Sequence, residues 1–109
     1  MILNLKYVLH IPTHKFENKI VTAINMKKCM EDLEKKLNEN GYHSFYKTKV
    51  EGHYKSRTFE EVLITIFTSD TVEPQPDKLF IEWFKEHNDE LKQESFAYEK
   101  NNELIIEKL

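Results

Sequence analysis

The sequence predicts an α+β fold of the ferredoxin-like type, a βαββαβ sandwich with an antiparallel sheet, two helices on one face and a short C-terminal hairpin. Three observations lead to this prediction. Residues 2–11 alternate between apolar and polar side chains, and residues 60–70 form the longest apolar, β-branched run of the chain. Residues 25–40 and 77–91 carry apolar side chains at helical spacing.

Residues 60–70 are expected to form a central strand, because the run is short, β-branched and free of Gly and Pro. Its side chains alternate between two faces, with Val62, Ile64 and Ile66 on one and Leu63, Thr65 and Phe67 on the other. Both faces are largely apolar, so both should be covered. We expect the helices on one face, and another copy of the chain or a ligand on the other.

The first strand is expected over residues 2–11 and should end at Pro12, which cannot donate a backbone hydrogen bond. Its core side would hold the odd-numbered apolar residues, and its other side would hold His10. Residues 13–24 mix apolar and charged side chains and are expected to be a loop with a short extended piece.

Two helices follow from the spacing of apolar residues. In residues 25–40 they recur every three or four positions, and Gly41 is suited to end the helix. In residues 77–91 the apolar stripe is more aromatic, and Pro76 suits the first helical turn. The two stripes consist of Met26, Met30, Leu33 and Leu37, and of Phe80, Trp83, Phe84, His87 and Leu91.

A long strand is expected over residues 42–55, with a bulge or bend at Gly52, and it should pair with the central strand as an antiparallel hairpin. A last strand from about residue 92 and a short strand at residues 104–106 would form the terminal hairpin. The first and third strands of the βαββαβ order would then be central, in agreement with their apolar character.

At 109 residues the chain is expected to be one domain, residues 1–109, with enough length for a single core. Its one cysteine, Cys29, allows no internal disulfide and favours a reducing compartment. No apolar run is long enough for a membrane span, and the N-terminus lacks the pattern of a secretory signal. We therefore expect a cytoplasmic protein that does not contact membranes.

The net charge of −3 is unevenly distributed. Residues 42–58 hold four cationic side chains against Glu51 alone, which gives this stretch +3 and leaves −6 for the rest of the chain. An uneven charge distribution of this kind points to an anionic partner.

The candidate ligand site follows from this basic stretch, where rings that stack on bases alternate with cations that bind phosphates. It has no phosphate loop and no zinc-binding spacing, so no metal or cofactor is predicted. The predicted ligand-binding residues are Lys47, Lys49, Lys55, Arg57, Tyr46, Tyr54, His43, His53 and His10.

Several short motifs resemble those of an uncharacterised ferredoxin-like domain family found in bacteria and phages. They are KYVLHI at residues 6–11, Gly41-Tyr42, GHY at residues 52–54, E-x-x-x-I-x-I at residues 60–66 and LKQESFAYE at residues 91–99. The resemblance covers most of the chain and departs from the family pattern at residues 12–21. It implies the fold and a mobile-element origin, and it transfers no catalytic residue.

We expect a non-enzymatic binding protein of phage or mobile-element origin. It would form a homodimer and would sequester an anionic, nucleotide-like molecule or block an acidic host protein surface. One alternative is a small enzyme of the dimeric α+β barrel type, with a pocket between the helices and the sheet and with His10 or His43 as base. A buried polar cavity that contains one of these histidines near a carboxylate would favour it, and a solid apolar interior would count against it. A second alternative, a nucleic-acid-binding module, is disfavoured by the acidic remainder of the chain.

Overall fold

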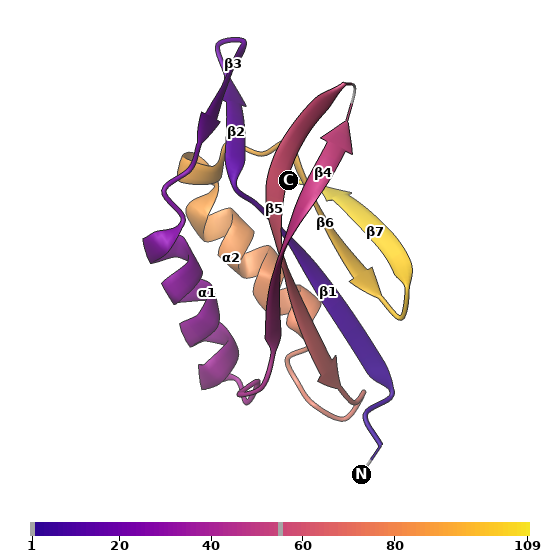
Figure 1. The fold of residues 1–109 in the computed structure, drawn as a ribbon. Coiled ribbons are helices and arrows are strands. Elements are labelled where there is room, and N and C mark those ends of the chain that lie inside the picture. The colour runs from indigo at the N-terminus through magenta and orange to yellow at the C-terminus, as the bar shows by residue number, and fades with distance from the viewer. Residues whose placement is uncertain (1, 55) are drawn as a thin grey trace.

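The computed structural model describes residues 2–54 and 56–109, without the side chain of Tyr54. Within these residues the chain forms two helices, and strands precede, separate and follow them in the sequence (Figure 1). The strands are β1 (Leu5–Pro12), β2 (His14–Glu17), β3 (Ile20–Ala23), β4 (Tyr46–Tyr54), β5 (Arg57–Thr68), β6 (Ser95–Lys100) and β7 (Glu103–Lys108). The helices are α1 (Lys27–Glu39) and α2 (Pro76–Leu91).

The main sheet has the strand order β4-β5-β1-β6-β7, and every neighbouring pair is antiparallel. Both helices lie on the same side of this sheet (Figure 1). The predicted α+β class with an antiparallel sheet is therefore confirmed. Neither helix among the described residues is long and apolar enough to cross a membrane.

The expected loop at residues 13–24 is instead a second, two-stranded sheet, formed by β2 and β3. Asn18 and Lys19 connect the strands with positive φ angles of 54° and 63°, the backbone of a tight two-residue hairpin turn. The sequence signal of this turn is weak because Lys19 stands at the position where such turns usually have Gly. The hairpin projects at the end of the molecule where β4 ends and β5 begins (Figure 1).

The strand before the central one also differs from the prediction. It begins at Tyr46 rather than residue 42, and Tyr42 is buried, with its hydroxyl donating to the carbonyl of Pro74 at 2.7 Å. The expected bulge at Gly52 is absent, since β4 and β5 pair without interruption from Tyr46 opposite Thr65 to Tyr54 opposite Arg57.

The core lies between the helices and the sheet, and Trp83 is its largest fully buried side chain. The Trp83 ring stacks on Phe80 and meets Phe84 edge-on, at centroid distances of 5.9 Å and 5.2 Å. Its indole N–H donates to the carbonyl of Cys29 at 2.7 Å, so it also joins the two helices. The aromatic stripe predicted for the second helix thus forms the centre of the core.

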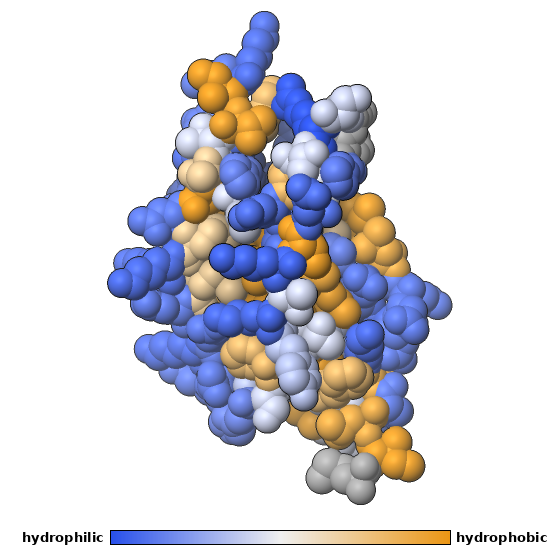
Figure 2. Space-filling model, viewed as in Figure 1, coloured by the Kyte–Doolittle hydropathy of each residue, from blue (hydrophilic) through white to orange (hydrophobic). Residues whose placement is uncertain are grey.

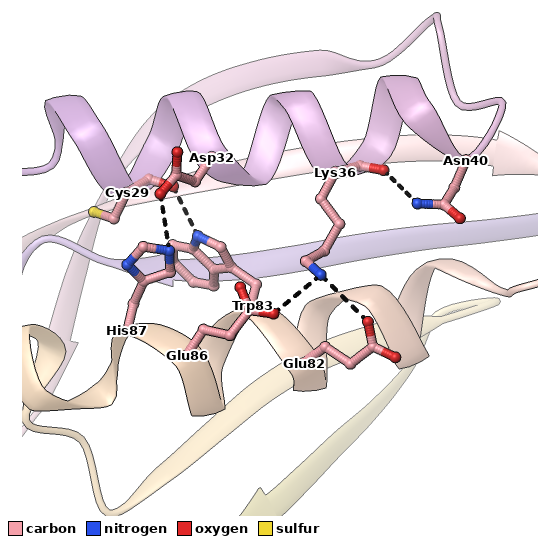
Figure 3. A network of polar contacts seen from close by, with 8 residues as sticks. All are labelled: Cys29, Asp32, Lys36, Asn40, Glu82, Trp83, Glu86 and His87. Carbon is pink, nitrogen blue, oxygen red and sulfur yellow. Dashed lines mark hydrogen bonds and ion pairs between the residues drawn. The ribbon is translucent and has the colours of Figure 1, made fainter.

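Polar contacts extend the helix–helix contact toward solvent (Figure 3). Lys36 of α1 lies 3.3 Å from a carboxylate oxygen of Glu82 and 3.3 Å from one of Glu86, both on α2. His87, expected within the apolar stripe, lies at its edge and contacts Asp32 at 3.3 Å. These pairs are partly exposed and contribute little, while the buried rings supply most of the stability.

The other face of the sheet is not covered by any element among the described residues. Four large side chains on it are strongly exposed: Tyr46 (69%), Phe67 (47%), Leu104 (58%) and Ile106 (66%). Figure 2 shows apolar surface beside β7 and on the β2–β3 hairpin, whereas the surface over α1 is hydrophilic. The two-sided apolar character of the central strand therefore corresponds to one covered face and one open face.

Replacing Trp83 by Phe should lower the free energy of unfolding by about 2 kcal/mol, because the smaller ring leaves a cavity and the carbonyl of Cys29 loses its donor. Urea unfolding followed by circular dichroism measures the change. Tyr46→Phe, at an exposed aromatic residue, should stay within about 0.5 kcal/mol of the wild type. Equal midpoints for the two variants would contradict this account of the core.

Candidate active site

A cavity of about 740 Å³ opens where the β2–β3 hairpin meets the end of the main sheet. Its walls come from the end of β1, the start of β5, the start of β6 and the connection between α2 and β6. Its volume lies within the range of small-molecule sites. The lining side chains that bear on chemistry are His10, His14, Lys15, Phe16, Arg57, Phe59, Glu61, Lys92, Gln93 and Glu94.

His10 lies in this cavity between two carboxylates from the neighbouring strands. Its Nε2 lies 2.7 Å from Oε2 of Glu99, and its Nδ1 lies 3.5 Å from Oε2 of Glu61. The strand register explains the arrangement, because β5 and β6 pair with the two edges of β1. All three side chains lie on the open face of the sheet and are partly exposed.

The carboxylates change the acidity of the imidazole. The hydrogen bond with Glu61 is the largest cause and raises the pKa of His10 above its usual value near 6.5, while partial burial lowers it and Glu99 raises it. Although Glu99 is the nearer carboxylate, the two act in the same direction. The carboxylates therefore let His10 keep its proton to a higher pH than an isolated imidazole does, and a second cation in the site would act in the opposite direction.

Gly52 shapes the wall beside Glu61. A Cβ atom at Gly52 would lie 2.8 Å from Cε2 of Phe59 and 3.2 Å from Oε1 of Glu61. The Phe59 ring and one oxygen of Glu61 thus occupy the space that a side chain would fill. Since Gly41 is the glycine with a positive φ among the described residues, Gly52 is required for space and not for backbone conformation.

Gln93 fixes the hairpin wall relative to the rest of the cavity. Its side-chain amide donates to the carbonyl of His14 at 3.0 Å and to that of Leu91 at 2.7 Å. The side chain of Asn88 in turn bonds both backbone groups of Gln93, at 3.0 Å and 3.1 Å. Gln93, which precedes β6 within the LKQESFAYE motif, therefore links two walls of the cavity.

The cationic side chains of the predicted ligand site lie on both faces of the sheet. Lys47 and Lys49 lie on the helix side of β4, where Lys47 contacts Glu34 of α1 at 2.6 Å. Lys49 borders a small separate hollow of about 260 Å³. Arg57 lies on the open face and lines the main cavity. Lys55 lies outside the described residues, as does the side chain of Tyr54.

The remaining predicted residues are also dispersed. Tyr46 is exposed on the open face. His43 precedes β4 and its Nδ1 lies 3.2 Å from Oδ1 of Asn38. His53 is exposed near the hairpin tip, 3.4 Å from Glu51. Of the predicted set, the cavity joins His10 and Arg57, and the ligand-binding role of the others stays a prediction.

The sequence did not single out Glu61 and Glu99 as partners of His10. They lie 38 positions apart, and each is one of the chain's 19 acidic residues. One usable signal is the alternation of side chains along a strand. Glu61 and Glu99 each alternate with the core side chains of their own strand, so each lies on the face opposite the core. That signal becomes informative only when the neighbours of the first strand are known.

The described residues give little support for a metal site or for a reactive thiol. Within residues 2–54 and 56–109, no group of three His, Cys, Asp or Glu side chains could hold a metal ion. Cys29 is buried, and burial raises the pKa of its thiol. A buried thiol of raised pKa is a poor nucleophile.

Neither family models nor curated proteins match this sequence. Two solved structures of phage SAM lyase share the fold. One, in the apo state, has a TM-score of 0.58 at 13% identity, with 96% of this chain and 89% of that chain covered. The other, in complex with S-methyl-5′-thioadenosine, has a TM-score of 0.56 at 14% identity and the same coverage.

These neighbours correct our main functional prediction. We expected a non-enzymatic binding protein, but the structures that share the fold are those of an enzyme. The finding favours the alternative, a small enzyme. The expected sign of that alternative is present in part: His10 lies near carboxylates at a cavity. The cavity is open and largely apolar rather than buried and polar, and the aromatic core fills the space between the helices and the sheet. The two neighbours are phage proteins, whereas the phage origin of this chain stays a prediction.

Gly52→Ala should lower the pKa of His10 toward its usual value, because the new methyl group displaces Phe59 and the carboxylate of Glu61. Nuclear magnetic resonance titration of the His10 ring measures this pKa. Glu61→Gln should shift it in the same direction.

Thr48→Ala is the matched control, since Thr48 lies on the same strand and the same face, opposite Leu63. It should leave the pKa of His10 unchanged. A titration curve of Gly52→Ala that coincides with that of the wild type would show that Gly52 does not position Glu61.

Proposed function

We propose that this protein is a small lyase that cleaves a carbon–sulfur bond of S-adenosylmethionine and releases S-methyl-5′-thioadenosine, with His10 as the base. The observation that carries the proposal is the placement of His10 between Glu61 and Glu99 at a cavity of about 740 Å³. The fold shared with phage SAM lyase, one structure of which is in complex with S-methyl-5′-thioadenosine, supports it.

The cavity suits the charge of such a substrate. The sulfonium group is a cation, and the carboxylates of Glu61 and Glu99 attract it to the open face of the sheet. As the sulfonium approaches, its charge lowers the pKa of His10 and favours release of the imidazole proton to solvent. The substrate thereby helps to generate the base that acts on it.

The proposed reaction needs no oxidant or reductant. The imidazole takes a proton from the carbon next to the one bonded to sulfur, and the electrons of that C–H bond form a carbon–carbon double bond. The bond between carbon and sulfur breaks, and its electron pair stays on sulfur, which becomes a neutral thioether. Glu61 and Glu99 stabilise the imidazolium that results.

His10→Gln should reduce kcat/KM for S-adenosylmethionine about 100-fold, the contribution typical of a general base. His43→Gln is the matched control, because His43 bonds Asn38 away from the cavity and should retain wild-type activity. Chromatography of released S-methyl-5′-thioadenosine measures the rate. Failure of the wild type to form this product, or equal rates for the two variants, would contradict the proposal.

The pH profile tests the same assignment. Because the base must be unprotonated, kcat/KM of the wild type should rise as pH increases through the pKa of His10, which lies above 6.5. In Glu61→Gln the rise should occur at lower pH, because the hydrogen bond that raises this pKa is weakened. A rise at the same pH in both proteins would exclude His10 as the titrating base.

We also propose that two copies associate through the open face of the sheet. The four exposed apolar side chains on that face lie on β4, β5 and β7, and a two-fold arrangement would bury the same patch on both copies. His10 lies on this face, so the second copy would border the site. This oligomer retains the homodimer expected from the two-sided central strand.

Analytical ultracentrifugation at micromolar concentration should give a dimer for the wild type and a monomer for the double variant Phe67→Glu/Ile106→Glu. Ile20→Glu is the control, since Ile20 is equally exposed but lies on the β2–β3 hairpin. A monomeric wild type, or dissociation by Ile20→Glu alone, would rule out association through this face.

The strand order supports a finer description of the fold. Without the β2–β3 hairpin and β7, the chain runs β1, α1, β4, β5, α2, β6, and these strands lie in the order β4-β5-β1-β6. We propose that the fold is a ferredoxin-like sandwich with two added elements. The first of these, the hairpin, provides one wall of the cavity.

A further inference from the structure

Arg57 is the chain's one arginine, and it opens β5 at the cavity. Its guanidinium carbon lies 5.3 Å from the centroid of the Phe16 ring, which belongs to the β2–β3 hairpin. A cation over an aromatic ring at this distance is held by a favourable interaction. The guanidinium is thus positioned across the gap between two walls of the cavity.

This positioned charge has no anionic partner within the described part of the chain. In residues 2–54 and 56–109, no carboxylate lies within 4.0 Å of the guanidinium, and Glu17 of the hairpin pairs with Lys15 instead. By contrast, Lys36 and Lys47 each lie against a carboxylate. An arginine that is oriented yet unpaired in a cavity is suited to bind an anion from outside.

The order of side chains along β5 gives the cavity two charged ends. Arg57, Phe59 and Glu61 are alternate residues of one strand, so they lie on one face, with about 13 Å between the first and last Cα atoms. The resulting site presents a cation at one end, an apolar floor, and a carboxylate beside His10 at the other end.

We propose that Arg57 binds the carboxylate of the substrate, while Glu61 and His10 face its cationic sulfur. The guanidinium is planar and offers parallel N–H donors that match the two oxygens of a carboxylate. This inference rests on the proposed function and extends it, because it assigns recognition of the amino-acid part to a residue outside the chemical step. Arg57 is therefore a specificity residue for zwitterionic substrates.

Two unreactive thioethers test the assignment by isothermal titration calorimetry. S-adenosylhomocysteine carries the amino-acid carboxylate, whereas S-methyl-5′-thioadenosine lacks it, and neither has a sulfonium that can be cleaved. Arg57→Gln should weaken binding of S-adenosylhomocysteine about 10-fold and change binding of S-methyl-5′-thioadenosine less than about 2-fold. Arg57→Lys should show an intermediate loss, because it keeps the charge but loses the paired donors.

Lys85→Gln is the matched control, since it removes one positive charge from an exposed position of α2 that does not line the cavity. It should bind both compounds as the wild type does. Equal weakening of both compounds by Arg57→Gln, or no weakening of either, would overturn the role of Arg57 and leave the lyase proposal standing. A wild type that binds neither compound would instead refute the proposed function, and this inference with it.

Discussion

The pairing of β1 with strands on both of its edges is the interaction on which the rest of the structure depends. β1 pairs with β5 along its whole length and with β6 on the other side. The same hydrogen bonds bring Ile64 and Ile66 over the core and place Glu61 and Glu99 beside His10. A register shift of one residue would expose the core side chains and remove the carboxylates from the imidazole, so stability and the candidate site have one common cause.

The two faces of the sheet differ in their surroundings and in the side chains that they carry. The helix face is filled by an aromatic cluster around Trp83, and it admits little change because interiors are closely packed. The open face carries His10, its carboxylates and Arg57, together with the β2–β3 hairpin that completes the cavity. Charged side chains are tolerated on this face because water still reaches them, and this leaves room for chemistry on a chain of only 109 residues.

The errors of prediction have identifiable physical origins. The basic stretch was treated as one site because its residues are close in sequence, yet adjacent residues of a strand point to opposite faces, which separates Tyr46 from Lys47. The β2–β3 hairpin was missed because its turn, Asn18-Lys19, lacks glycine. Gly52 was read as a sign of a bulge, whereas it leaves space for Phe59 and Glu61.

The sequence by itself determined the elements and the class of fold, because helical and strand periodicity are local properties of the side chains. It identified the two helices, the central strand and the face on which Trp83 lies. Only the tertiary structure decided which of five histidines lies between two carboxylates at the cavity, and which cations line that cavity. Those relations join residues up to 89 positions apart through strand pairing, and no local pattern in the chain encodes them.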